Sequence, residues 1–309
     1  MPTKIIPKNI SQLILENYPL APLTTWRIGG PAQYLAVPQD LEDIFQLLRL
    51  AQARGWPLFF LGRGSNLLIA DEGLPGLTLH LARSLQGIEL QRDTLRVGAG
   101  VALPRLARAA ANLGFSGFEF LAGIPGTVGA AARLNASAHG QDLAGVLSRV
   151  WVVTPQLNLL EFKAKELALR YRSSLLLNFP HWLVVEAEFS IRTPAPPEAV
   201  KGRMQELLAA RRAAQPTNPR SCGSVFKNPP HAPAAGYLID AAGFKGRRLG
   251  DALVSRKHAN FILNQGRATA AQIKALVAQI QETVWHTQKV ALEREVVFLP
   301  DDVLLRNKG

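Results

Sequence analysis

The side chains best suited to chemistry lie in residues 221–229, which read SCGSVFKNP. This stretch holds a thiol, hydroxyls, an ammonium group and an amide, and buried polar groups need partners that a ligand can supply. Side chains alternate between the two faces of a strand, so we expect Ser224, Phe226 and Asn228 to share one face. A hydroxyl and an amide there can hold and protonate a small oxygenated ligand. The alternative is an edge strand whose serine caps a turn.

Two glycine-rich stretches have backbones that can approach a ligand closely. The strand-like residues 58–61 run directly into GRGSNL, and a glycine turn after a strand lets backbone N–H groups point at a phosphate. No helix is predicted after this turn, so the dinucleotide fingerprint of strand, turn and helix is not met. Residues 123–129, GIPGTVG, permit close approach to a flat ligand or to a packed helix. Two such stretches in one half of the chain favour one shared ligand.

Length, composition and charge indicate a globular chain with anionic partners. The 309 residues suffice for two domains, and 48% apolar with 19% charged residues is typical of a globular protein. The formal net charge is +12, and residues 201–260 carry 11 Lys and Arg against 3 Asp and Glu. Nucleic acid or a phosphorylated small molecule satisfies this charge, but the motifs of nucleic-acid-binding modules are missing.

Cysteine, histidine and apolar patterns exclude several classes of site. A lone cysteine, Cys222, excludes an internal disulfide and favours a reducing cytoplasm. The longest uncharged apolar run, residues 121–132, is shorter than the roughly 20 residues of a membrane-spanning helix. The histidines lack the spacing of metal ligands, so we expect no metal site.

The elements that must position these residues indicate an α+β protein. Asp40 is predicted to cap a helix that ends at Gly55. Further helices are predicted at 103–113, 198–214, 235–242 and 269–285. A final strand over residues 290–299 is expected to carry Glu293 and Glu295 on one face. The proline-rich residues 193–197 are the linker candidate between two domains.

Seven short motifs, in order along nearly the whole chain, together resemble the UDP-N-acetylenolpyruvoylglucosamine reductases, the MurB family. They are TTWRIGGPA, LGRGSNLL, LAGIPGTVGAA, YRSS, GSVFKNP, VSRKHANFILN and LEREV. The chain lacks a longer insertion between the YR motif and the serine, so it resembles the shorter, second type. The resemblance implies an N-terminal segment (1–22), a p-cresol methylhydroxylase-type FAD-binding domain (23–192) and a smaller α+β substrate-binding domain (193–309).

The resemblance also implies the cofactors and the residues that bind them. FAD would be bound non-covalently, with NADPH as co-substrate. The FAD-binding candidates are Gly62, Arg63, Gly64, Ser65, Asn66, Leu67, Gly123, Ile124, Pro125, Gly126, Thr127 and Gly129. The substrate-binding candidates are Tyr171, Arg212, Gln215, Lys227 and Asn228.

The implied reaction reduces UDP-N-acetyl-3-O-(1-carboxyvinyl)-glucosamine to UDP-N-acetylmuramate in peptidoglycan precursor synthesis. Hydride passes from NADPH to the flavin and then to C3 of the enolpyruvyl ether, which leaves an enolate at C2 that needs stabilisation and a proton. The resemblance assigns the proton to Ser224 and the stabilisation to Arg172 and Glu295. We prefer Glu295 to Glu293 because it directly precedes a Val-Val-Phe segment, as the family's glutamate precedes its valine.

Some positions depart from the family's motifs, and other functions stay open. Ala130, Ser137, His139 and Cys222 differ from the family pattern, and a thiol beside a flavin is a candidate for oxidation. We expect a cytoplasmic monomer that binds a UDP-sugar, with no nucleic acid and no membrane partner. One alternative is another FAD-dependent oxidoreductase of the same domain class, acting on a small alcohol. The other is a non-catalytic, basic nucleic-acid-binding protein.

Overall fold

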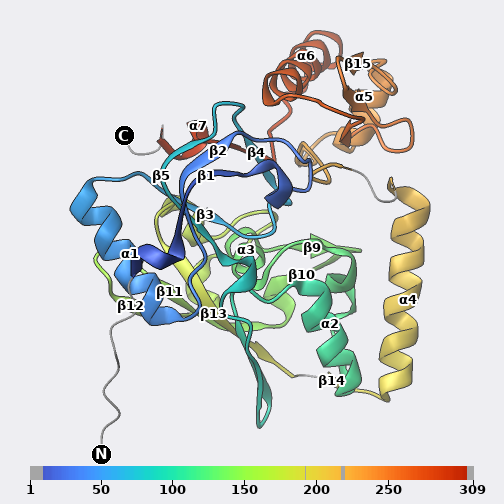
Figure 1. Ribbon diagram of the computed structural model, residues 1–309. Helices are drawn as coiled ribbons and strands as arrows, with labels where there is room; N and C mark the ends of the chain where they lie inside the picture. Colours follow the sequence, from blue (N-terminus) through green and yellow to red (C-terminus); the bar gives the residue numbers. More distant parts are fainter. Residues whose placement is uncertain (1–9, 192, 217–219, 305–309) are drawn as a thin grey trace, which may run out of the picture.

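The computed structural model describes residues 10–191, 193–216 and 220–304, which form an α+β fold (Figure 1). Its N-terminal sheet has the order β1-β2-β5-β3, with β1 antiparallel to β2 and with β2 and β3 parallel to β5. These strands are β1 (Ile14–Pro19), β2 (Pro31–Ala36), β3 (Leu58–Leu61) and β5 (Leu74–His80). The predicted N-terminal segment, residues 1–22, begins outside the described residues and includes β1, which the sequence did not predict.

Helix α1 (Leu41–Arg54) forms as its sequence predicts. The side chain of Asp40 accepts a hydrogen bond from the backbone N–H of Asp43, and Gly55 ends the helix in the left-handed region. Ile44 and Leu47 are buried in a cluster that also contains residues of β5 and β13. The helix therefore joins the N-terminal sheet to the sheet that follows.

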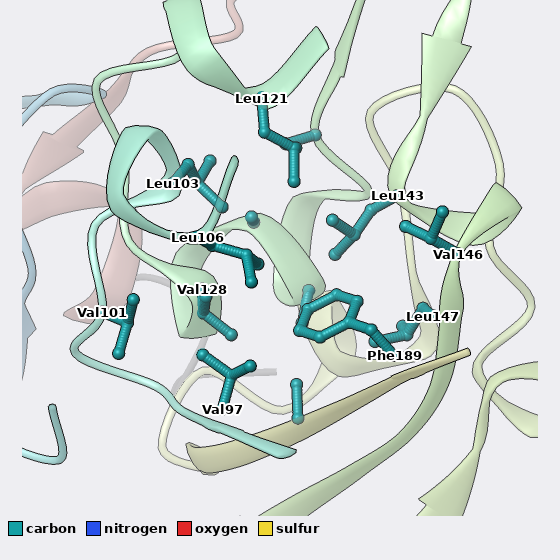
Figure 2. Packing of buried hydrophobic residues seen from close by; sticks show 14 of the residues in the cluster. Val97, Val101, Leu103, Leu106, Leu121, Val128, Leu143, Val146, Leu147 and Phe189 are labelled. Carbon is teal, nitrogen blue, oxygen red and sulfur yellow. The ribbon is translucent and has the colours of Figure 1, made fainter. Parts of the chain in front are cut away.

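The second sheet is antiparallel and has the order β12-β11-β13-β7-β6. Its strands are β6 (Ile88–Gln91), β7 (Thr94–Gly98), β11 (Leu147–Val153), β12 (Leu159–Lys163) and β13 (Leu183–Ser190). Helices α2 (Leu103–Asn112) and α3 (Val128–Leu134) pack against it. The short strands β9 (Ser137–Ala138) and β10 (Gln141–Asp142) follow α3 and pair with each other. Figure 2 shows the packing of this largest core, in which Phe189, Leu106 and Val128 are fully buried. The chain between β7 and β11 contributes many of the residues that line the candidate active site.

Helix α4 (Pro197–Ala214) packs with this first core, beside α2 (Figure 1). Its Leu207 is buried in the same cluster as Leu106. The residues expected to form a free linker instead begin with β14 (Thr193–Pro194), which pairs with β8 (Phe115–Ser116). The domain boundary at residue 193 stays a prediction. Helix α4 follows that boundary and so falls in the predicted second domain, yet it packs against the core of the first.

The C-terminal half is a small sheet covered by helices. Strands β15 (Arg248–Leu249), β16 (Ala252–Val254) and β17 (Ile262–Asn264) form the sheet, with α5 (Ala235–Ala241) and α6 (Ala270–Gln288) in the same core. Trp26 and Leu68 of the first half are buried in that core. The carboxylate of Asp71 accepts from the backbone N–H groups of Ala270 and Ala271, at the start of α6. The two halves are therefore joined by shared packing and by a helix cap.

The chain then returns to its first half. Strand β18 (Val297–Leu299) pairs in parallel with β4 (Leu67–Ile69), and α7 (Asp301–Leu304) follows. The strand expected over residues 290–299 is therefore only three residues long. Residues before it pair with the serine stretch instead, since Phe226 and Arg294 form an isolated bridge. No helix in the described part of the chain is long and apolar enough to cross a membrane.

Candidate active site

A cavity of about 740 Å³ lies where the two halves meet. Its walls come from the second glycine-rich stretch, the β9–β10 turn, the end of α4 and the serine stretch. A smaller cavity of about 240 Å³ adjoins it, since Ser65, Asn66, Gly126, Ala130 and Leu134 line both. The two adjoining cavities are together lined by both glycine-rich stretches and by the serine stretch.

Every residue of the first glycine-rich stretch lines the smaller cavity. All of Gly62, Arg63, Gly64, Ser65, Asn66 and Leu67 contact it. Gly64 has φ +58°, and a Cβ atom there would lie 2.5 Å from the carbonyl oxygen of Leu23. The turn is therefore held tightly against residues 23–25, where the backbone N–H of Thr25 donates to the Gly64 oxygen at 3.1 Å. As the sequence predicts, an extended segment and not a helix follows the turn.

The second stretch also reaches these cavities, with one exception. Ile124 and Pro125 line the larger cavity, Thr127 and Gly129 line the smaller one, and Gly126 lines both. Gly123 lines neither of these two cavities. A Cβ atom at Gly123 would lie 2.7 Å from Cδ of Arg211, so this position makes room for an arginine stem and not for a ligand.

Together, the two cavities fit an elongated ligand with phosphate and flat-ring parts, such as the implied FAD. A tight backbone turn borders the smaller cavity, and small or apolar residues such as Ile124, Pro125 and Ala130 line the larger one. Backbone N–H groups of a glycine turn suit phosphate oxygens, and a glycine- and alanine-rich wall admits a flat ring.

The serine stretch reaches the larger cavity, but it is not a regular strand. Ser224 and Asn228 line the cavity, whereas Phe226 is buried in the C-terminal core. The prediction that these three side chains share a face is therefore wrong. Single bridges to Phe261 and Arg294 break the alternation, and consecutive Val225 and Phe226 are both buried.

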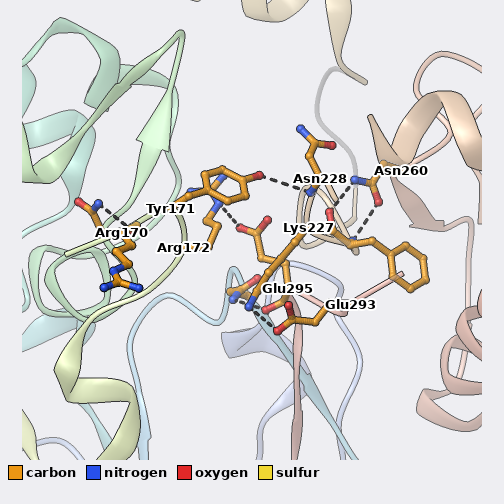
Figure 3. A network of polar contacts seen from close by, with 11 residues as sticks. Arg170, Tyr171, Arg172, Lys227, Asn228, Asn260, Glu293 and Glu295 are labelled. Atoms are coloured by element: carbon orange, nitrogen blue, oxygen red, sulfur yellow. Dashed lines mark hydrogen bonds and ion pairs between the residues drawn. The ribbon is translucent and has the colours of Figure 1, made fainter. Parts of the chain in front are cut away.

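Asn260 and Tyr171 hold the serine stretch in place (Figure 3). The Asn260 side chain accepts from the Phe226 N–H at 2.9 Å and donates to its carbonyl oxygen at 2.8 Å. The backbone N–H of Asn228 donates to the Tyr171 hydroxyl at 3.5 Å, a contact between the two halves of the chain. Ser224 is thus presented to the cavity by a stretch whose next residues are anchored at Phe226 and Asn228.

Arg172 and Glu295 meet at the same cavity. Arg172 lies in a tight turn in which Arg170 and Ser173 exchange backbone hydrogen bonds at 3.0 Å, and its φ of +51° is unusual for a residue with a side chain. Its Nε lies 2.8 Å from Oε1 of Glu295 (Figure 3). Burial raises the pKa of Glu295, against the opposing effect of Arg172 and Lys227.

The structure distinguishes the two glutamates of the C-terminal segment. The Glu295 side chain is 13% exposed and lines the cavity, whereas the Glu293 side chain is 72% exposed. Glu293 pairs with Lys227 (Figure 3). The preference for Glu295 therefore agrees with its placement beside Ser224 and Arg172.

The substrate-binding candidates divide into two groups. Tyr171, Gln215 and Asn228 line the larger cavity, whereas Lys227 does not. Arg212 is exposed and also lies off the cavity.

The sequence reasoning missed the neighbouring Arg211, which lines the larger cavity. Burial, and then the positive charge of Arg172, lower the pKa of Arg211. The helical period could have found it, because Arg211 follows the buried Leu207 by four positions and shares its face.

The four departures from the family pattern all lie at this cavity. Ala130, Ser137, His139 and Cys222 contribute to its lining. Burial and the nearby Arg211 lower the pKa of His139. The Cys222 thiol donates to the carbonyl oxygen of Leu67 at 3.2 Å, and burial raises its pKa to about 12. The thiolate is the reactive form of cysteine, so burial and the raised pKa disfavour oxidation of Cys222, which stays a prediction.

No group of three or more His, Cys, Asp and Glu side chains among the described residues is arranged to hold a metal ion. The cavity presents hydroxyl, guanidinium, carboxyl and amide groups. A hydroxyl beside a paired guanidinium and a carboxyl of raised pKa can stabilise an oxyanion and deliver a proton.

Two family models match the two parts of the chain. A model described as FAD binding domain matches residues 32–160. A model described as UDP-N-acetylenolpyruvoylglucosamine reductase, C-terminal domain, matches residues 215–299. The first covers β3 and β5 and nearly all of β2 in the N-terminal sheet, and β6, β7 and β11 in the antiparallel one, and the second covers Ser224 and Glu295.

Curated proteins and a solved structure resemble the chain over most of its length. A UDP-N-acetylenolpyruvoylglucosamine reductase of Synechococcus sp. (strain WH7803) is 47% identical over 289 residues, which cover 92% of each protein. One of Halalkalibacterium halodurans is 41% identical over 283 residues, or 92% of this chain and 93% of that protein. The crystal structure of the Thermus caldophilus enzyme, titled MurB, matches with a TM-score of 0.79 at 36% identity, covering 93% of this chain and 98% of that one.

Proposed function

The chain belongs to the UDP-N-acetylenolpyruvoylglucosamine reductase family, and from that membership we propose how its side chains divide the reaction. It is an FAD-dependent reductase of peptidoglycan precursor synthesis. Membership in this family displaces both alternatives, an alcohol-oxidising flavoenzyme and a non-catalytic nucleic-acid-binding protein. We further propose that NADPH supplies the electrons and that the enzyme is a cytoplasmic monomer.

The loop of residues 62–67 would hold the FAD pyrophosphate through its backbone N–H groups, and residues 124–127 would lie along the ring. Bound FAD supplies the hydride that adds to the enolpyruvyl double bond. The two adjoining cavities support this assignment, because the whole glycine turn lines the smaller one and Ser224 lines the larger one.

Ser224 donates the proton that completes the reduction. A serine hydroxyl is a weak acid, so it can protonate only a strongly basic carbon, and an enolate at C2 is such a base. Because Asn260 fixes the backbone two residues further on, the Ser224 hydroxyl keeps its place at the cavity.

Arg172 and Glu295 stabilise the negative charge that develops on the carboxylate-bearing intermediate. The guanidinium of Arg172 offers donors in a fixed plane, and its contact with Glu295 orients it toward the cavity. Because its pKa is raised, the Glu295 carboxyl takes up a proton more readily than a free glutamate does, and in that form it donates to a substrate carboxylate without repelling it. The two side chains thus act as an oxyanion site in the cavity that Ser224 also lines.

The UDP-sugar occupies the rest of the larger cavity. Tyr171, Gln215 and Asn228 supply polar contacts there, and Arg211 supplies a positive charge for an anionic group of the substrate. Arg212 and Lys227, which lie off this cavity, have a smaller part in binding.

The observation that carries the proposal is the meeting of Ser224, Arg172 and Glu295 at the cavity that the glycine-rich loops also line. In the Ser224→Ala variant, we expect NADPH to reduce the flavin at the wild-type rate. Oxidation of the reduced flavin by the enolpyruvyl substrate should slow by about 100- to 10,000-fold, the usual contribution of a positioned proton donor.

Both half-reactions are followed separately by stopped-flow absorbance of the flavin. Ser221→Ala is the matched control, because Ser221 is a buried serine of the same stretch that does not line the cavity. Equal losses in the two half-reactions of Ser224→Ala, or an equal loss in the Ser221 control, would contradict the role of Ser224.

A further inference from the structure

The backbone of Glu295 is held by hydrogen bonds from two distant parts of the chain. Its N–H donates to the carbonyl oxygen of Val225 at 2.8 Å, next to Ser224. Its own carbonyl oxygen accepts from the side-chain amide of Asn66 at 3.0 Å. Two residues later, the N–H of Val297 donates to the backbone oxygen of Asn66, also at 3.0 Å. Asn66 therefore forms hydrogen bonds with the C-terminal segment on both sides of Val296.

These hydrogen bonds from and to Asn66 begin where regular strand pairing is missing. Strand β18 begins only at Val297, so the Glu295 carbonyl lies before the ladder that β18 forms with β4. The amide of Asn66 supplies the hydrogen bond that a ladder would otherwise give. Without it, the peptide that carries Glu295 keeps its contact with Val225 but its carbonyl oxygen loses its hydrogen bond to the cofactor loop.

Asn66 also belongs to the loop proposed to hold FAD. It lines both the smaller and the larger cavity, at their junction. The same loop holds the serine stretch, because the thiol of Cys222 donates to the Leu67 oxygen at 3.2 Å. One short loop thus contacts the segments that carry both Ser224 and Glu295.

We propose that Asn66 is a positioning residue for Glu295, whose side-chain amide ties the Arg172–Glu295 pair to the cofactor loop rather than binding the cofactor itself. This inference rests on the proposed function of Glu295. Its consequence is that loss of the amide displaces the carboxyl and slows the step in which Glu295 acts, while FAD binding stays intact.

The first measurement needs no activity. In FAD-free protein, hydrogen–deuterium exchange of a peptide spanning residues 293–299 should be faster in Asn66→Ala than in wild type. The control is Gln288→Ala, which removes another half-buried amide that donates to a backbone carbonyl, that of Leu238 at 2.8 Å, far from the cavities. Unchanged exchange in Asn66→Ala, or equally fast exchange in the control, overturns the inference.

The second measurement separates positioning from cofactor binding. We expect Asn66→Ala to bind FAD within about twofold of wild type and to be reduced by NADPH at a similar rate. Oxidation by the enolpyruvyl substrate should slow by about 10- to 100-fold, the loss expected when a reacting group is displaced by a fraction of an ångström to 1 Å. If the FAD dissociation constant rises by that same factor, Asn66 is a cofactor ligand and the inference fails. Asn66→Leu, similar in shape but without a donor, replaces the alanine variant if that one does not fold.

The third measurement tests whether Asn66 acts through Glu295. In a Glu295→Gln background, Asn66→Ala should slow the substrate step by less than about twofold further. If the rate losses of Asn66→Ala and Glu295→Gln multiply fully in the double variant, the positioning role is overturned. A Glu295→Gln variant that by itself leaves the substrate step unchanged would instead refute the proposed function, so the two failures are distinguishable.

Discussion

Replacing Gly64 by alanine tests the cofactor loop most directly. Gly64 has φ +58°, and its added methyl group would meet the Leu23 oxygen at 2.5 Å and Cα of Thr24 at 2.7 Å. Contacts of a Cβ atom below 3.0 Å are essentially unknown, so the turn must move by roughly half an ångström or more. The backbone donors of residues 62–67 would move with it.

Gly55 provides a matched control for the backbone conformation. Its φ is +62°, but a Cβ atom there would have no neighbour within 4 Å. A residue with a side chain in the left-handed region costs about 1–2 kcal/mol, and both alanine variants share this cost. Overpacking adds about 1–3 kcal/mol to Gly64→Ala alone. At about 2 °C per kcal/mol for a chain of this size, Gly55→Ala lowers Tm by about 2–4 °C and Gly64→Ala by about 4–10 °C.

The displaced backbone donors should also weaken cofactor binding. A hydrogen bond to a charged group contributes about 1.5–3 kcal/mol, so a displaced phosphate donor weakens FAD binding by about 10- to 100-fold. Thermal unfolding of the FAD-free variants gives Tm, and titration of the free protein with FAD, followed by flavin fluorescence, gives Kd. We expect Gly55→Ala to keep the wild-type Kd. If Gly64→Ala bound FAD as tightly as wild type despite its lower Tm, the loop would not be the phosphate-binding element.

Three further outcomes follow from the charges and the burial at the site. Burial raises the pKa of Glu295, so between the ordinary pKa of a glutamate and the raised native value the native state binds more of this proton than the unfolded chain does. Glu295→Gln should therefore gain stability relative to wild type as the pH rises from the ordinary range of a glutamate through the raised value, and a constant Tm difference would contradict this. With a pKa of about 12, Cys222 should resist alkylation by iodoacetamide at pH 8 until the protein is denatured, as judged by mass spectrometry, and fast labelling of the native protein would show an accessible thiolate. Arg211→Gln should raise KM for the UDP-sugar by about 10-fold, because it removes a charge from the cavity, and by much more than Arg212→Gln does; similar values in steady-state assays would contradict the assignment.

Local sequence signals predicted the elements that short-range physics controls. Helix α1 begins after Asp40 and ends at Gly55, because a side-chain cap and a left-handed glycine satisfy its terminal groups. Strand β3 occupies the predicted residues, and the extended segment after Gly64 follows from the absence of a helical pattern. These features depend on contacts within a few residues.

The errors occurred where distant contacts override the local pattern. Period-2 alternation placed Phe226 beside Ser224, yet Phe226 turns into a core formed with Trp26 and residues of α6. A continuous strand was expected around Glu295, yet single bridges and the amide of Asn66 hold that segment. Neither partner is close in sequence, so no local pattern could reveal them.

The sequence by itself determined the family, the order of the motifs and the residue types that the chemistry requires. Only the tertiary structure decided that Glu295 is enclosed while Glu293 is exposed, that Arg211 and not Arg212 reaches the cavity, and that Gly123 accommodates an arginine stem. The physical reason is that burial, charge and steric contact at this site arise between distant segments, such as those of Asn66 and Glu295, which are 229 positions apart. The energies that select one neighbouring side chain over the next exist only once those segments have packed together.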